Sequence, residues 1–232
     1  MYFQDLFKII SSTEYLGYYL GGFANTLALT FSAAIIGLVL GFVVALVKIA
    51  AEQNKWMKIP SVICNIYTTV FRGTPVALQL FFWCFAVFTI PGFKPYAAII
   101  TFGINSGAYI SENIRAGISS VDKGQLEAGR TLGLSWTVTM VRVIMPQAVK
   151  NIIPAIGNEI IALLKETAII ALVGATVGTL TFDLSAAANT VTFKTSYVAA
   201  YTIAAILYLA VVYILVFALK LIERRLKKSE KR

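Results

Sequence analysis

The chain has 232 residues, of which 58% are hydrophobic and only 13% are charged, and it carries a net charge of +9. Because an average soluble domain has about 25% charged residues, this composition excludes an ordinary soluble protein and predicts a protein of the lipid bilayer. The sequence has no His and only two Cys, so a metal site has little support.

Five charge-free runs follow one another along the chain, at 15–47, 73–93, 95–111, 167–182 and 195–219. A helix needs about 20 apolar residues to cross the hydrocarbon core, so the third and fourth spans must each include a charged residue. We predict five transmembrane helices near 20–47, 62–90, 95–118, 154–175 and 196–221, in one domain over residues 1–232. The alternating segments typical of membrane barrels are not visible. The predicted fold class is therefore an all-α polytopic membrane protein.

Lysine and arginine gather in three places: the segment after the first span, the long loop 119–150 and the C-terminal tail. Such residues favour the cytoplasmic side of a membrane. With five spans, this distribution predicts an N-terminus outside the cell and a cytoplasmic C-terminus. Topology thus accounts for most of the charge, and we expect the lipid bilayer, not nucleic acid, as the partner of this basic chain.

Polar side chains recur at helical spacing within three of the predicted spans. These stripes consist of Thr68, Arg72, Pro75 and Gln79 on the second span, Thr101, Asn105, Tyr109 and Glu112 on the third, and Glu159 and Glu166 on the fourth. Ionised groups inside a bilayer usually face a cavity or a partner. The stripes either line one aqueous path, with Gln79, Asn105, Tyr109, Glu112, Glu159 and Glu166 as candidate path residues, or satisfy one another, as in a pair of Arg72 with Glu112.

The segment TFDLSAAANTVTFK (181–194) separates the last two predicted spans. It has the composition of a short helix or re-entrant piece on the outer side. Asp183 could belong to an external gate, but a helix-capping role is the favoured interpretation.

The loop segment QLEAGRTLGLSWTVTMVRVIMPQAV (125–149) is polar and punctuated by Gly. Its anchors Glu127, Ala128, Gly133 and Pro146 have the spacing of the cytoplasmic EAA loop, and this segment resembles that loop of ATP-binding-cassette importer permeases. Gly129 stands where the second Ala of the pattern would be. The resemblance implies a type I importer permease fold in which this loop is a helical elbow that docks on an ATPase.

Three further segments narrow the resemblance to permeases of polar amino-acid importers. They are FRGTPVALQLFF (71–82), NSGAYISENIRAGISSV (105–121) and KETA (165–168). The resemblance implies a multi-pass protein of the bacterial plasma (inner) membrane that acts with a separate ATPase and an extracellular or periplasmic amino-acid-binding protein. It also implies a second permease copy, for which we favour a homodimer over a heterodimer.

The chain has no phosphate-binding loop and no evident nucleophile–base pair. We therefore expect no catalytic residue and no cofactor in this chain, with ATP and magnesium bound by the partner ATPase. The carboxylates of Glu112 and Glu166 favour a cationic amino acid such as arginine, lysine or histidine as the substrate. The alternative is an ion-coupled secondary transporter that uses the intramembrane carboxylates Glu112, Glu159 and Glu166.

Overall fold

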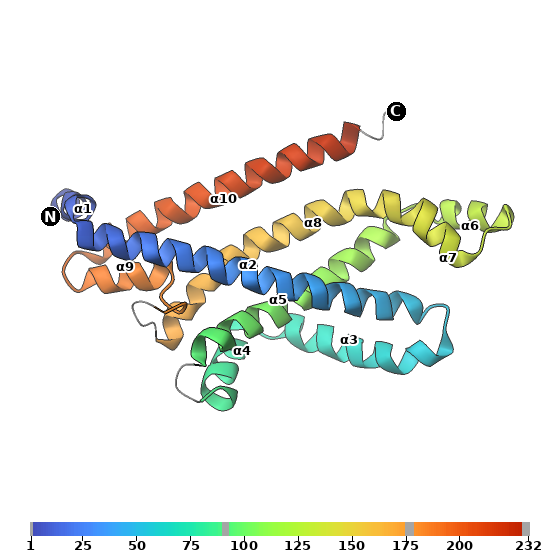
Figure 1. Ribbon diagram of the computed structural model, residues 1–232, viewed down its shortest axis with the longest axis horizontal. Helices are drawn as coiled ribbons and strands as arrows, with labels where there is room; N and C mark the ends of the chain where they lie inside the picture. The colour runs from blue at the N-terminus through green and yellow to red at the C-terminus, as the bar shows by residue number, and fades with distance from the viewer. Residues whose placement is uncertain (1, 90–92, 175–178, 229–232) are drawn as a thin grey trace. The chain divides into compact units, whose positions relative to one another are not determined.

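The computed structural model describes residues 2–89, 93–174 and 179–228, and all regular structure within these ranges is helical (Figure 1). The α-helices are α1 (Tyr2–Ser11), α2 (Thr13–Ala50), α3 (Lys58–Gly73), α4 (Val76–Phe82), α5 (Lys94–Ser119), α6 (Lys123–Thr131), α7 (Trp136–Thr139), α8 (Met145–Glu166), α9 (Leu184–Thr192) and α10 (Tyr197–Lys228). Short 3₁₀ segments cover Lys55–Met57 and Thr167–Val173, and π-helical segments cover Trp83–Val87 and Met140–Ile144. The prediction of an all-α fold is confirmed for these residues.

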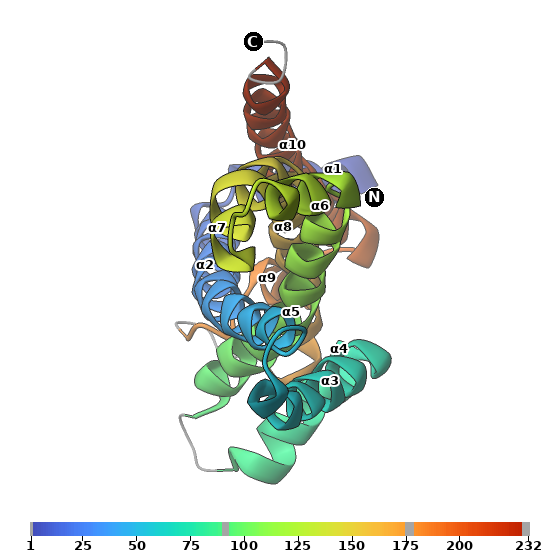
Figure 2. The same cartoon turned by 90° about the vertical axis from the view of Figure 1, so that its right-hand side faces the viewer.

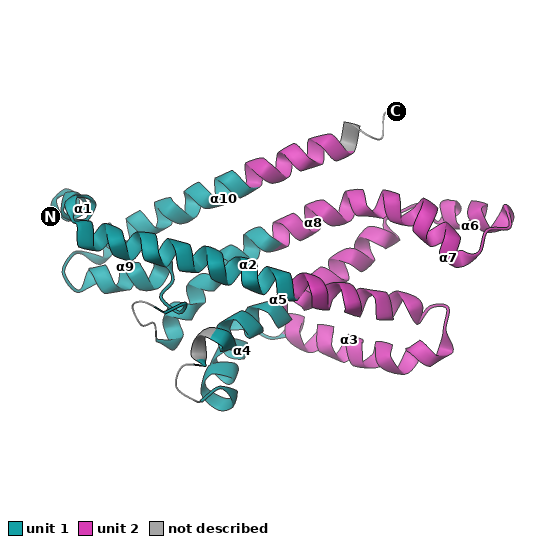
Figure 3. Cartoon of the chain, in the orientation of Figure 1, with its two compact units in different colours: residues 1–36, 74–104, 160–215 teal, residues 37–73, 105–159, 216–232 magenta. Residues whose placement is uncertain are grey.

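The chain divides into two compact units, coloured separately in Figure 3. Unit 1 comprises residues 1–36, 74–104 and 160–215, and unit 2 comprises residues 37–73, 105–159 and 216–232. Four long helices, α2, α5, α8 and α10, each contribute residues to both units.

The second predicted span, 62–90, is not one continuous helix. It is broken between α3 and α4 at Thr74 and Pro75, and residue 90 lies outside the described residues. Proline has no backbone N–H and disfavours helical backbone at the residue before it, which explains why α3 ends at Gly73. The predicted stripe Thr68–Gln79 therefore does not form a single helical face.

The helix in the fourth predicted span, 154–175, has bounds that differ from those expected. Helix α8 begins at Met145, and Pro154 lies inside it rather than at its start. The helix extends further because Ala148 and Ile152 are buried in the core of unit 2. At the other end α8 stops at Glu166, where a 3₁₀ segment begins and the Thr167 hydroxyl donates to the Leu164 carbonyl oxygen at 2.8 Å. Residue 175 is outside the described residues.

The other three predicted spans correspond to α2, α5 and α10, each within several residues of the expected bounds. Within the described ranges, α2 and α10 are long and apolar enough to cross a membrane, and the broken pair around Pro75 would be a third span if counted as one. Helices α5 and α8 do not reach that apolarity, because charged residues such as Glu112, Arg115, Glu159 and Lys165 interrupt them. The short helix α1 was not predicted.

Unit 1 has two apolar clusters, one of which surrounds α9. Six of the nine residues of α9 are buried, including its run of alanines. The apolar ones belong to the same cluster as Tyr15 and Tyr19 of α2 and small residues of α10. The small side chains allow close packing of α9, α2 and α10. The prediction of a short helix in 181–194 is confirmed.

Asp183 is the N-cap of α9 and is fully buried. Its Oδ1 accepts a hydrogen bond from the Ala186 N–H at 2.8 Å, and its Oδ2 accepts one from the Tyr208 hydroxyl at 3.1 Å. The favoured capping role is thus observed. Burial disfavours the charged form and raises the pKa of Asp183 to about 6, although these hydrogen bonds act in the opposite direction.

We expect Asp183→Asn to change how stability depends on pH. A carboxyl whose pKa rises on folding contributes stability that is present below its unfolded pKa, near 3.8, and is lost as the pH rises through about 6. A shift of this size corresponds to about 3 kcal/mol at most. Thermal unfolding in detergent should show the wild type losing stability between pH 4 and 7 relative to Asp183→Asn, because Asn can cap without ionising.

Asp122→Asn is the matched control, since Asp122 also caps a helix but is exposed. An equal pH-dependent difference in this control would contradict burial as the cause.

Candidate functional site

The predicted coupling loop 119–150 folds, within unit 2, into a helical elbow formed by α6, α7 and the π-helical turn that leads into α8. Asp122 caps α6 by accepting a hydrogen bond from the Gly124 N–H at 2.8 Å. Ser135 caps α7 by accepting one from the Val138 N–H at 3.3 Å. Gly133 lies between the two helices at φ 78°, a conformation that glycine adopts without steric cost. Figures 1 and 2 show α6 and α7 side by side.

Gly129 is the contact point between α6 and α7. It is buried, and a Cβ atom there would lie 2.4 Å from Cγ2 of Thr139, a fully buried residue of α7. Real Cβ atoms do not approach other atoms this closely. The departure from the E-A-A pattern at Gly129 is therefore explained by Thr139, which occupies the space that an alanine methyl group would need.

The outer side of the elbow presents exposed side chains. Glu127, Ala128 and Pro146 are exposed, whereas Gly129 is buried. Leu132, a residue that sequence reasoning missed, is 79% exposed at the turn beside Gly133. The sequence signal that could have found it is a large apolar residue beside the glycine of the motif. A short polar helix with an exposed leucine at its end is suited to docking on another protein.

A cluster of charged side chains lies elsewhere in unit 2, where α2, α3 and α5 meet. Oε1 of Glu112 is 2.7 Å from Nζ of Lys48, and its Oε2 is 3.0 Å from Nη2 of Arg115 and 4.0 Å from Nη1 of Arg72. Lys48 is buried and also donates to the Thr68 hydroxyl at 2.7 Å. The Arg72 guanidinium lies 5.2 Å from the centre of the Tyr109 ring.

This cluster changes the interpretation of Glu112. Both of its oxygens face cations of this chain, so its negative charge is already compensated. The predicted pair of Arg72 with Glu112 exists, but Lys48 makes the closer contact. Lys48 and Arg115 were missed as members of the site, because the position of Lys48 at the end of a span was interpreted only as a mark of topology.

Three other candidate path residues donate hydrogen bonds to carbonyl groups around the break at Pro75. Asn105 Nδ2 donates to the Phe71 carbonyl oxygen at 2.9 Å, and the Tyr109 hydroxyl donates to that of Arg72 at 3.4 Å, both within unit 2. Within unit 1, Gln79 Nε2 donates to the carbonyl oxygen of Thr74 at 3.1 Å and to its hydroxyl at 2.9 Å. The end of a helix leaves carbonyl groups without intrahelical partners. These side chains therefore stabilise the broken backbone.

Glu159 and Glu166 are both half-buried on α8. Glu159 belongs to unit 2 and Glu166 to unit 1. In the described ranges no group of His, Cys, Asp or Glu side chains could hold a metal ion.

The family model of the binding-protein-dependent transport system inner membrane component matches residues 37–228. The chain belongs to this family. The permease is 41% identical over 216 residues to the arginine transport system permease protein ArtQ of Bacillus subtilis, a match that covers 91% of this chain and 93% of ArtQ. It is 40% identical over 205 residues to the putative glutamine transport system permease protein GlnP of Rickettsia felis, covering 87% and 89% of the two chains.

Solved structures support the same assignment. The crystal structure of an amino acid ABC transporter with histidines has a chain 37% identical to this permease, with a TM-score of 0.82 and coverage of 94% of this chain and 98% of that one. The MetNI methionine ABC transporter, in an inward-facing conformation, shares the fold with a TM-score of 0.77 at 21% identity, covering 93% of this chain and 99% of its own. The permease thus has the type I fold and is an inner-membrane component of an amino acid ABC transporter.

We expect Gly129→Ala to destabilise the elbow and Thr139→Ala to relieve most of that effect. Overpacking of this kind costs about 1–3 kcal/mol, and removal of Cγ2 and Oγ1 of Thr139 frees the space that the new methyl group needs. Thermal unfolding of the two single variants and the double variant measures the coupling between the sites. Strictly additive effects would contradict the packing explanation.

We expect Glu112→Gln to destabilise the permease more than the double variant Lys48→Met with Glu112→Gln. The single change leaves the buried Lys48 ammonium without its carboxylate, which costs about 3–5 kcal/mol for a fully buried pair and less here, since Glu112 is partly exposed. The measurement is thermal unfolding in detergent, with Glu159→Gln as the control on α8. A double variant less stable than the single variant would contradict compensation of Lys48 by Glu112.

Proposed function

We propose that this permease forms the transmembrane path of an ATP-driven amino-acid importer and that its elbow couples the path to a separate ATPase subunit. The observation that carries the proposal is the exposed elbow, whose helices are capped by Asp122 and Ser135 and packed through Gly129. Glu127 and Leu132 are exposed on it and are available for contact with a protein partner. The ATPase binds ATP and magnesium, and this chain catalyses no covalent step.

The transmembrane arrangement in the proposal has five spans: α2, the broken pair α3 with α4, α5, α8 and α10. Helices α5 and α8 cross as part of the bundle, with their polar residues turned from lipid, as is usual for polar groups at that depth. The basic C-terminal tail and the elbow lie on the cytoplasmic side, and the N-terminus lies outside. A binding protein delivers the amino acid on the outer side.

Two copies of the permease form the transporter in this proposal, because two ATPase subunits must close together and each needs an elbow. A homodimer is the simplest assembly with that symmetry. ATP-driven closure moves both elbows and alternates access to the path. An ion-coupled secondary transporter is not favoured, since it would have no use for an ATPase-docking elbow.

The proposed substrate is a polar amino acid, with cationic amino acids preferred. Glu159 and Glu166 support this preference as half-buried carboxylates of α8. Glu112 contributes less than the sequence suggested, because Lys48 and Arg115 already compensate it. Among the relatives, ArtQ is named for arginine and GlnP for glutamine, so both charge classes belong in the test.

The test is ATP hydrolysis in liposomes that contain the permease, its candidate ATPase and its candidate binding protein. We expect arginine, lysine or histidine to stimulate hydrolysis more than glutamine or glutamate. Glu127→Lys should weaken stimulation without preventing insertion, because it reverses a charge on the exposed elbow surface. Glu223→Lys, the same charge reversal on α10 and away from the elbow, is the control.

Three outcomes would contradict the proposal. Uptake driven by an ion gradient with the permease alone would replace it with the secondary transporter. If amino acids stimulate ATP hydrolysis equally in the Glu127→Lys variant and the wild type, the elbow does not couple the path to the ATPase. Stronger stimulation by glutamine or glutamate than by the cationic amino acids would overturn the substrate class and leave the ATP-driven path intact.

A further inference from the structure

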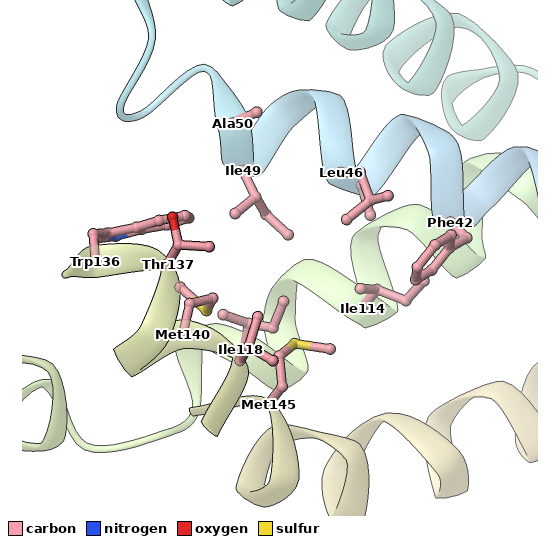
Figure 4. Close-up of a pocket in the computed structure, with 12 residues that line it drawn as sticks. Phe42, Leu46, Ile49, Ala50, Ile114, Ile118, Trp136, Thr137, Met140 and Met145 are labelled. Carbon is pink, nitrogen blue, oxygen red and sulfur yellow. The ribbon is translucent and has the colours of Figure 1, made fainter. Parts of the chain in front are cut away.

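Unit 2 contains an apolar cavity of about 420 Å³ between the elbow and the ends of α2 and α5 (Figure 4). We call it the elbow cavity. Its walls include Phe42, Leu46 and Ile49 of α2, Ile118 of α5, and Trp136 and Met140 of the elbow. A volume of this size lies in the range of small-molecule sites, about 300–1,000 Å³. No role in coupling or in the substrate path accounts for it.

The lining of the elbow cavity excludes a polar occupant. Apart from the hydroxyl of Thr137 and the indole N–H of Trp136, its side chains are apolar. The α-ammonium and α-carboxylate of an amino acid would have no partners there, and a buried charge without a partner is strongly disfavoured. Met140 and Met145 are flexible side chains that adapt to an irregular apolar guest. The chemistry fits an alkyl chain.

A second cavity, of about 250 Å³, adjoins the first one and is lined by both charged and apolar side chains. The two cavities share Ile49, Ile118, Trp136 and Met140 as lining residues. The second cavity adds two acidic and two basic side chains, which we call the rim: Glu52, Asp122, Arg115 and Lys123. An apolar chamber with an ionic mouth matches an amphiphile, with its tail in the first cavity and its head at the second.

The helix ends that line the two cavities indicate which kind of amphiphile would bind there. Helix α2 ends at Ala50, where the sequence changes from apolar to charged within a few residues, and the last turns of α5 already carry Glu112 and Arg115. This change is the mark of the boundary between hydrocarbon and water in a membrane protein. A phospholipid has the same change of chemistry at the same depth and is present at high concentration.

We propose that the elbow cavity binds one acyl chain of a phospholipid from the leaflet on the elbow's side, with a zwitterionic headgroup at the rim. The phosphate lies near Arg115 and Lys123, and the ammonium lies near Glu52 and Asp122. Arg115 can serve the lipid while paired with Glu112, because a guanidinium carries five N–H donors. The acyl chain joins the elbow to α2 and α5. This inference does not depend on the proposed function.

Quenching of Trp136 fluorescence by brominated lipid tests the proposal. The full-length permease carries Trp56→Phe and Trp83→Phe, so that Trp136 remains as its one tryptophan. It is reconstituted in vesicles of phosphatidylcholine with or without bromine on the acyl chains, and the ratio of the two intensities is measured. We expect strong quenching, because the bromine atoms lie against Trp136 inside the elbow cavity.

Filling the cavity should remove that quenching. Thr137→Phe places a ring in the cavity, whereas Val138→Phe changes the next residue, which does not line it. A second pair on α2 is Leu46→Phe, which fills the cavity, and Val43→Phe, which does not. The second pair gives the same test if Thr137→Phe fails to fold. Quenching that is equal in the filled and control variants would show contact with bulk lipid only and would overturn the proposal.

Mixed vesicles test the headgroup. Brominated phosphatidylcholine is added to unlabelled phosphatidylglycerol, and we expect quenching of Trp136 to rise more steeply than the mole fraction of the brominated lipid. A rise in proportion to the mole fraction would overturn the zwitterionic headgroup. If addition of the ATPase abolishes the quenching, the cavity is a binding site for the ATPase and the proposal is overturned. If dimer formation abolishes it, the cavity is a binding site for a second permease copy, which also overturns the proposal. Failure of the ATPase to bind, by contrast, leaves the quenching unchanged and counts only against the proposed function.

Discussion

Irregular backbone in an apolar chain needs hydrogen-bond partners that lipid does not supply, and the placement of polar side chains in both units follows from this constraint. The break before Pro75 exposes carbonyl groups that accept hydrogen bonds from Asn105 and Tyr109 in unit 2. In unit 1 the same need arises before α9, where Asn25 donates to two carbonyl oxygens and Thr26 accepts from the Leu184 N–H. Polar residues that suggest a solute path are thus also structural ones.

Glu112, a charged candidate path residue, also has a structural role. Glu112 holds Lys48 of α2 and Arg115 of its own helix and lies near Arg72 of α3, so that one carboxylate joins three helices of unit 2. Burying an ammonium group beside a carboxylate costs less free energy than burying either charged group without a partner. The cluster has more cations than anions, which makes Glu112 a weak attractant for a cationic solute.

The sequence motif predicted the presence of the elbow but not the packing and exposure of its side chains. The spacing of Glu127, Gly133 and Pro146 carried the resemblance to the EAA loop, and that resemblance implied a helical elbow. The structure has α6 and α7 there with Gly133 at the turn. The motif could not explain Gly129, because the reason is Thr139, ten residues further along the chain. Leu132 was missed for a related cause: exposure of an apolar side chain is a property of the folded turn, and the sequence does not contain it.

The sequence by itself determined the all-α class, the approximate places of α2, α5 and α10, the elbow and the family, because apolar runs and fixed motif spacings are local patterns. Only the tertiary structure decided how far α8 extends and which partners Glu112 and Asp183 have. These features depend on contacts between residues far apart in the chain. Periodicity along one helix shows which side chains share a face, but the atoms that meet that face come from other helices.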